Sequence, residues 1–83
     1  MAGAKLTPNK EREYAEKLRR FIKAELKRAN VSYKELALRL SKHGLDETEA
    51  GIASKLSRGT FSATFLLATL AVLELEGVRL EDL

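Results

Sequence analysis

The stretch "DETEAGIASKLSRG", residues 46–59, contains the start and stop signals of a short helix. Either Asp46 or Thr48 can act as its N-cap, because both side chains accept hydrogen bonds from the free amides of a first helical turn. Negative charge near that turn offsets the positive end of the helix dipole. A glycine such as Gly59 can take the left-handed backbone conformation that ends many helices. The stretch therefore predicts a helix over residues 47–58.

The residues before this stretch predict two more helices. Over residues 10–29, apolar side chains recur at three- and four-residue steps, which is the spacing of one helix face. That stripe contains Tyr14, Leu18, Phe21, Ile22, Leu26 and Ala29. Ser32 and Glu35 then form a capping box, in which the hydroxyl accepts from the Glu35 amide and the carboxylate reaches back to the Ser32 amide. The helix that follows is expected to end near Lys42, before Gly44, and to bury Leu36, Ala37 and Leu40.

The residues after the stretch predict a fourth helix and a short closing segment. Ser62 is placed to cap this helix, and Phe61 is placed to pack against a residue one turn further on. Residues 62–74 are apolar nearly all round the helix, so the helix is either central in the fold or shared with a second subunit. Residues 77–83 predict either an extended piece or a final helical turn.

The composition indicates one small helical domain. Of 83 residues, 45% are hydrophobic and 33% are charged, with five Gly and one Pro, which favours helix. We expect residues 1–9 to be a flexible N-terminal tail and residues 10–83 to form a single all-α domain, a compact four- to five-helix bundle. The absence of cysteine excludes disulfides and thiolate metal sites and suits a cytoplasmic protein. No apolar run approaches the roughly 18 residues of a membrane span, and residues 1–10 lack the apolar region of a signal peptide.

Charge is distributed unevenly along the chain, although the net charge is only +3. Residues 1–30 hold nine Lys or Arg against four Glu, whereas residues 60–83 hold one Arg against four acids. Residues 31–59 are nearly balanced, with five basic and four acidic side chains. The basic end indicates either a polyanionic partner or a solvated helix surface.

The chain offers few groups for catalysis, so we expect neither an enzyme nor a bound cofactor or metal. His43 is the single histidine, and beside a helix end it is better explained as a cap than as a ligand. Asp46 and Glu49 are better explained as capping groups than as a general acid and base. The glycines have neither the spacing nor the following Lys of a phosphate-binding loop.

Four pieces of the chain carry a resemblance through their order and spacing: "VSYKELALRL" (31–40), "ASKLSRG" (53–59), "FSATFLLATLAVLE" (61–74) and "GVRLEDL" (77–83). Together they resemble the lambda-repressor-like (XRE-type) helix-turn-helix family. The pattern "ETEA…KLSRGTFSATFLL" is similar to small bacterial helix-turn-helix domains of unassigned function. The resemblance covers about residues 18–83. Twelve residues separate Leu40 from Ala53, more than that family usually has there, so we expect a helix-turn-helix with a lengthened turn.

The resemblance implies a sequence-specific double-stranded DNA-binding protein, a small bacterial or phage transcriptional regulator without a cofactor. The helix over residues 47–58 would enter the major groove, and a homodimer through the helix over residues 62–74 would place two such helices in successive grooves. Such a protein would be cytoplasmic and associated with the nucleoid. The alternative is a protein-protein interaction module on the same scaffold, since a fold does not fix a function. Non-specific nucleic-acid binding through the first helix is a third hypothesis.

Carried over residue by residue, the base-reading positions of that family fall on Thr48, Glu49, Ala50, Gly51 and Ser54. The positions better placed for phosphates are Lys55, Arg58 and Thr60. Phosphate binding at the start of the second helix would involve Ser32, Tyr33 and Lys34. Tyr33 either bonds a phosphate or covers the edge of the core. A glycine inside a helix costs about 0.8–1 kcal/mol relative to alanine, so Gly51 indicates a close neighbour, which is either another helix or DNA.

Overall fold

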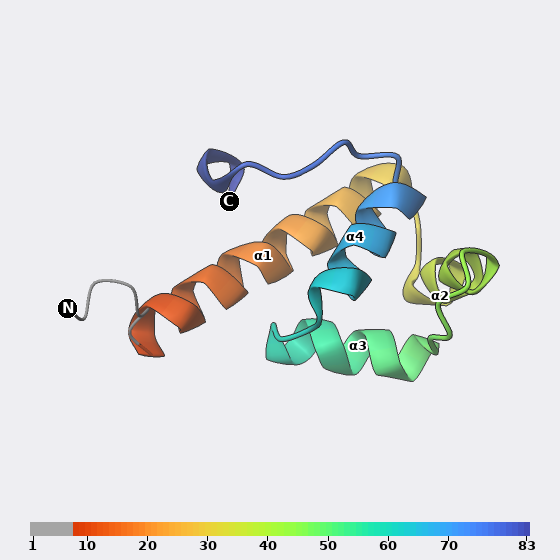
Figure 1. Ribbon diagram of the computed structural model, residues 1–83, viewed down its shortest axis with the longest axis horizontal. Helices are drawn as coiled ribbons and strands as arrows, with labels where there is room; N and C mark the ends of the chain where they lie inside the picture. The colour runs from red at the N-terminus through yellow and green to blue at the C-terminus, as the bar shows by residue number, and fades with distance from the viewer. Residues whose placement is uncertain (1–7) are drawn as a thin grey trace.

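The computed structural model describes residues 8–83, which form four α-helices and a terminal 3-10 turn without any strand (Figure 1). The helices are α1 (Pro8–Ala29), α2 (Tyr33–Lys42), α3 (Glu49–Arg58) and α4 (Ala63–Val72), and the 3-10 turn is η2 (Leu80–Asp82). The bundle measures 44 × 22 × 19 Å, and the N-terminal part of α1 projects from it. The predicted all-α bundle is thus confirmed, with α2 and α3 joined by the lengthened turn at residues 43–48.

The core lies where α2 packs against α3 and α4, and where the bundle meets the second half of α1. Its buried apolar side chains are Ile22, Leu26, Val31, Leu36, Leu40, Ile52, Leu56, Phe65, Leu70 and Val72. The predicted stripe on α1 is confirmed at Ile22 and Leu26, and Leu18 and Phe21 pack against the same cluster. Ala29 was predicted wrongly, because the chain reverses at Asn30 and sends Val31 into the core while Ala29 stays exposed.

Each of the three short helices begins with a hydroxyl cap. Ser32, Thr48 and Ser62 accept hydrogen bonds from the amides three residues further on, at 3.0, 2.9 and 3.0 Å. The cap of α3 is therefore Thr48 and not Asp46, and the helix begins at Glu49, two residues later than predicted.

The other predicted starts are confirmed in part. The Glu35 carboxylate accepts from Nε of Arg39 at 2.8 Å, so only the hydroxyl half of the predicted capping box is made. Phe61 packs edge-on against Phe65, with ring centroids 5.2 Å apart, as its place before the cap indicates. α1 begins at Pro8, two residues earlier than predicted, where the fixed φ of proline suits a first helical turn. Residues 1–7 of the predicted flexible tail lie outside the described residues.

α1, α2 and α4 end in the same backbone arrangement. A residue with positive φ follows each helix: Asn30 (φ 59°), Gly44 (φ 85°) and Glu74 (φ 60°). The amide of the next residue then donates back across the last turn, and each of the three bonds is 2.9 Å long: Val31 to Leu26, Leu45 to Leu40, and Leu75 to Leu70. This arrangement satisfies free carbonyls and folds an apolar residue back onto the helix. α4 thus ends at Val72 rather than at Glu74 as predicted.

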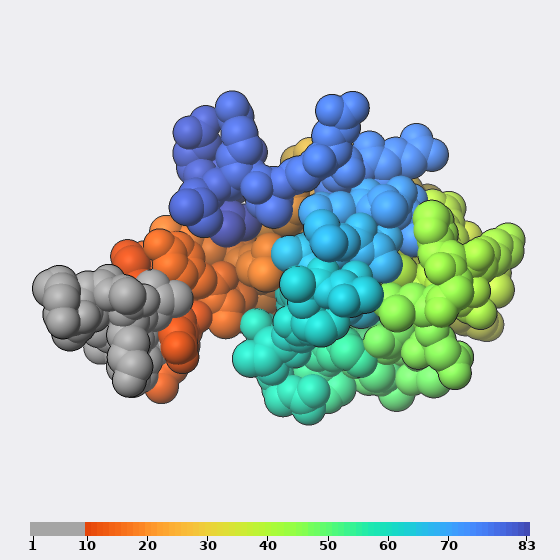
Figure 2. Space-filling model, viewed as in Figure 1, coloured from red at the N-terminus to blue at the C-terminus, as the bar shows by residue number. Residues whose placement is uncertain are grey.

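The C-terminal residues return along α1. After α4 the chain is extended to Arg79 and ends in η2, so both forms predicted for residues 77–83 occur in succession. Figure 2 shows this segment lying over the middle of α1, beside α4.

Gly59 fixes the place where α3 meets α1. Its φ is +70°, and a Cβ built on it would lie 3.2 Å from both the Cβ and the carbonyl oxygen of Ala15. Because one of these atoms belongs to helix backbone, the neighbour cannot move aside. The end of α3 therefore rests directly on the α1 backbone.

Three glycine-to-alanine variants separate the energetic cost of a left-handed backbone conformation from the cost of a close contact. Gly77→Ala is expected to change the free energy of unfolding by less than about 0.5 kcal/mol, because Gly77 has open space and no positive φ. Gly44→Ala is expected to cost about 1–2 kcal/mol through its left-handed conformation alone. Gly59→Ala should cost more than Gly44→Ala in urea denaturation. Equal costs would contradict a restraining contact with Ala15.

Thr69 carries the one buried side-chain oxygen of the described residues that has no hydrogen-bond partner. The residue is fully buried in α4, and an unsatisfied buried hydroxyl costs about 1–3 kcal/mol. Thr69→Val is therefore expected to raise the free energy of unfolding by about 1 kcal/mol, since it removes the hydroxyl and keeps the branched shape. Thr64→Val, at an exposed site of the same helix, is the control and should be nearly neutral. A destabilised Thr69→Val protein would show that the hydroxyl has a partner.

Candidate nucleic-acid interface

The solvent side of α3 carries only small side chains along its centre. Ala50, Ser54 and Ser57 are all exposed and follow one another at four- and three-residue steps. Ile52 and Leu56, on the opposite side, are fully buried. We call Ala50, Ser54 and Ser57 the α3 ridge. Because its side chains are short, the backbone of α3 can come close to another surface.

The α3 ridge lies between opposite charges. Glu49 is exposed in the first turn of α3, and Arg58 is exposed in its last turn. Arg58 Nη1 donates to Ser54 Oγ at 2.9 Å, so the structure brings these two predicted site residues together. Thr60 is exposed in the loop that follows. Thr48 is exposed as well, but its hydroxyl is engaged by the amide of Gly51.

Lys55 is held by an ion pair inside the protein. Its Nζ lies 2.9 and 3.1 Å from the two carboxylate oxygens of Glu47 and 5.6 Å from the ring centroid of Phe65. The side chains of Lys55 and Glu47 are only 29% and 12% exposed. Glu47 neutralises the charge of Lys55 in the free protein, so Lys55 is already paired before any phosphate approaches.

Gly51 lies beneath this ion pair. A Cβ built on it would lie 3.0 Å from Thr48 Oγ1 and 3.3 Å from Glu47 Oε1, and no other helix of the described residues comes within 4 Å of that point. The helix-packing interpretation of Gly51 is therefore wrong. Glu47, Gly51 and Lys55 follow at four-residue steps, so the missing side chain lets the carboxylate cross one turn to reach Lys55.

The start of α2 provides an exposed cation close to a groove. Lys34 is exposed, and Ser32 and Lys34 line an open groove of about 410 Å³ that Glu47 also borders. Tyr33 is half-buried and packs against the hydrophobic core, so its interpretation as a cover for the core edge is confirmed. Ser32 and Lys34 thus lie near the residues that lead into α3.

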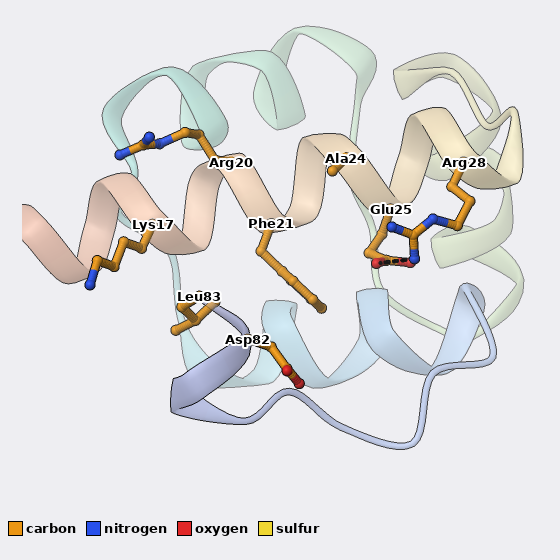
Figure 3. Close-up of a pocket in the computed structure, with 8 residues that line it drawn as sticks. All are labelled: Lys17, Arg20, Phe21, Ala24, Glu25, Arg28, Asp82 and Leu83. Carbon is orange, nitrogen blue, oxygen red and sulfur yellow. Dashed lines mark hydrogen bonds and ion pairs between the residues drawn. The ribbon is translucent and has the colours of Figure 1, made fainter.

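A second groove, of about 600 Å³, separates α1 from the C-terminal segment (Figure 3). Phe21 points into it, and Asp82 and Leu83 form its far wall. Its three cations already have carboxylate neighbours: Lys17 with Glu13 at 3.3 Å, Arg20 with Glu16 at 3.6 Å, and Arg28 with Glu25 at 2.8 Å. We therefore do not assign an anion site to this groove.

The sequence reasoning missed Glu47 and Ser57. Glu47 lies eight residues before its partner, beyond the three- and four-residue spacings at which helical ion pairs are sought. The glycine halfway between them was the available signal. Ser57 could have been found from its three-residue step after Ser54, which places both on one side of a helix.

The described residues contain no group of three or more His, Cys, Asp or Glu side chains able to hold a metal ion. Within the same range, no helix combines the length and apolar character needed to cross a membrane.

The architecture defines a small all-α bundle in which α2 and α3, joined by a turn at residues 43–48, pack against each other. The chain belongs to the family described as "Domain of unknown function (DUF6471)", whose model matches residues 14–78. The matched range contains α2, α3 and α4 in full and α1 from Tyr14 onward. Comparison with curated proteins and with solved structures found no match.

The Glu47–Lys55 ion pair should be energetically coupled more strongly than an exposed helical pair. A double-mutant cycle with Glu47→Gln and Lys55→Gln is expected to give a coupling of about 0.5–1 kcal/mol, because both side chains are largely shielded. The matched cycle at Glu35 and Arg39, whose side chains are 42% and 44% exposed, should give about 0.3–0.5 kcal/mol. Urea denaturation measures both. Equal coupling would show that burial adds nothing to the first pair.

Proposed function

We propose that this protein is a sequence-specific double-stranded DNA-binding protein, a small transcriptional regulator that places α3 in the major groove. The α3 ridge is the observation that carries the proposal, since an exposed helix side without bulky groups can approach base edges closely. The Ser57 hydroxyl can donate and accept, the Ser54 hydroxyl can donate while it accepts from Arg58, and the methyl group of Ala50 suits a thymine methyl. The resemblance of the chain to lambda-repressor-like helix-turn-helix proteins supports the same use of α3.

The charged residues beside the α3 ridge are proposed to have two roles, which are to position the protein on the duplex and to select its sequence. Arg58, at the end of α3, and Lys34, at the start of α2, are exposed and are proposed to contact phosphates, which fix position without reading sequence. Amides at the start of α2 add a further phosphate contact. Glu49 is proposed to accept from a cytosine amino group while repelling nearby phosphates, so it would favour few sequences.

The proposed regulator acts as a homodimer through the solvent side of α4. Leu67 is 65% exposed there, and Ala63 and Ala71, four residues before and after it, are exposed as well. Two subunits would place their α3 helices in successive major grooves, about 34 Å apart.

A protein-protein interaction module is the second candidate function, and a different observation favours it. Leu38 is 53% exposed on α2 and borders the groove that Ser32 and Lys34 also line. An exposed leucine beside a groove suits an apolar side chain of a protein partner.

Selection of genomic fragments with the purified protein, followed by footprinting, tests the DNA-binding proposal. Enriched fragments are expected to share a sequence, and their affinity should fall with salt. Arg58→Ala should lower the log–log salt slope by about 0.9, the value for one lost phosphate contact, whereas Arg79→Ala should leave it unchanged. Arg79 is a suitable control because it is exposed in the C-terminal segment, away from α3.

Ala50→Gln tests the α3 ridge directly. The longer neutral side chain should lower affinity for the enriched sequence at least tenfold by holding α3 away from the base edges. Ala24→Gln makes the same change at an exposed site of α1 and should have little effect. Failure of the parent protein to shift any duplex at low salt would exclude the DNA-binding proposal, and parental affinity in Ala50→Gln would remove the α3 ridge from the interface.

A further inference from the structure

One side of α1 carries a row of cations that have no role in the proposed contact between α3 and DNA. At 100° per residue, the row occupies roughly a third of the helix circumference. It consists of Arg12, Arg19, Arg20, Lys23 and Lys27. We call these five residues the basic stripe. The carboxylate of Glu16 lies among them, and Arg12 and Lys27 are separated by about 22 Å along the helix axis, at 1.5 Å per residue.

Most of this positive charge has no counterion within the protein. No carboxylate of residues 8–83 comes within 4.0 Å of Arg12, Lys23 or Lys27. Glu16 is shared between Arg19, which donates a hydrogen bond to it, and Arg20, whose Nε lies 3.6 Å away. The hydrogen bond from Arg19 lowers the pKa of Glu16, so this carboxylate stays ionised at neutral pH. Glu16 is thus the one carboxylate within the stripe, and Glu13, which pairs with Lys10 and Lys17, borders the stripe beside Arg12 and Arg20.

The basic stripe is open to solvent. Arg12, Arg20, Lys23 and Lys27 are exposed, with the Arg20 side chain 69% accessible, whereas the Arg19 side chain at the edge of the stripe is 26% accessible. The core-facing side of α1, at Ile22 and Leu26, is a different side of the helix. The C-terminal segment covers a third side, where Phe21 points toward it, and Arg20 points away from that segment (Figure 3).

The basic stripe also adjoins the helix-turn-helix. Tyr33, in the first turn of α2, packs against the hydrophobic core that Ile22 and Leu26 of α1 also join. The next residue is the exposed Lys34. The end of α3 rests on the α1 backbone at Ala15, between Arg12 and Arg19. The end of α3 therefore contacts the segment of α1 that bears the stripe, and α2 shares a hydrophobic core with α1.

We propose that the basic stripe is a second DNA surface, which binds the phosphate backbone of the duplex beside the site read by α3. The choice of DNA as the ligand rests on the proposed function, but the binding of phosphates by the stripe does not depend on base reading. Cations that replace the counterions of DNA give affinity for every sequence and a steep dependence on salt. The stripe would thus supply affinity that the few charges around the α3 ridge do not, and leave selection to α3.

The test compares two pairs of neutralised cations on two duplexes. Lys23→Gln with Lys27→Gln removes two charges from the stripe, and Lys42→Gln with Arg79→Gln removes two exposed charges from elsewhere. Fluorescence anisotropy over a series of salt concentrations would follow binding to the most enriched genomic fragment and to a scrambled duplex of equal length. The stripe variant should lower the log–log slope by about 1.8 on both duplexes, and the control variant should not.

A charge-conserving variant separates electrostatics from packing. Lys23→Arg with Lys27→Arg should retain the parental slope. An unchanged slope in the Gln variant of the stripe would overturn the proposal and leave the stripe as a solvated surface. Binding to anionic lipid vesicles, with no binding to either duplex, would overturn it in favour of a membrane surface.

The outcomes distinguish this proposal from the function on which it rests. Equal affinity of the parent protein for both duplexes, with a slope that falls in the stripe variant, would refute sequence-specific regulation and support the stripe. A clear preference of the parent protein for the enriched fragment, with a salt slope that the stripe variant leaves unchanged, would support sequence-specific regulation and refute the proposal for the stripe.

Discussion

The fold depends on three helices that are too short to exist alone. α2, α3 and α4 have ten residues each, whereas isolated helices need about 12–15 residues even for marginal stability in water. Each therefore relies on a capped end and on a shared core. Ser32, Thr48 and Ser62 satisfy amides at the three starts, and Leu36, Leu40, Ile52, Leu56 and Phe65 bury one side of each helix against the others. The 22-residue α1 completes this core with Ile22 and Leu26.

The lengths of α3 and α1 also affect how their charged side chains are used. The side of α3 beside its core-facing residues uses Glu47 and Lys55 to brace the first two turns internally, across the gap left by Gly51. Few charged groups then remain on the solvent side of α3. α1 is the opposite case, because its length exceeds what the core covers, and three of its exposed cations, Arg12, Lys23 and Lys27, make no ion pair with a carboxylate of residues 8–83. Under the two proposals, α3 would select the DNA sequence, and α1 would supply affinity for DNA of any sequence.

The sequence predicted those features that are determined within one helical turn. Ser32 and Ser62 were identified as caps because the hydroxyl and its amide lie three residues apart, and the burial of Leu36 and Leu40 followed from the helical period. Features that depend on the path between helices were missed. Asn30 and Glu74 take left-handed conformations, which their residue types indicate only weakly. Because the chain reverses at Asn30, Val31 lies in the core in place of the predicted Ala29. The same limit applied to Lys55, whose partner precedes the helix.

The contact between Gly59 and Ala15 has a consequence for how the protein can vary. At this point α3 and α1 meet through backbone and a methyl group, so this contact does not depend on the fit of large side chains. The α3 ridge and the basic stripe lie on other sides of these helices. Residues in either surface can therefore be exchanged without altering this contact. The protein has a fixed frame on which the two surfaces can diversify independently.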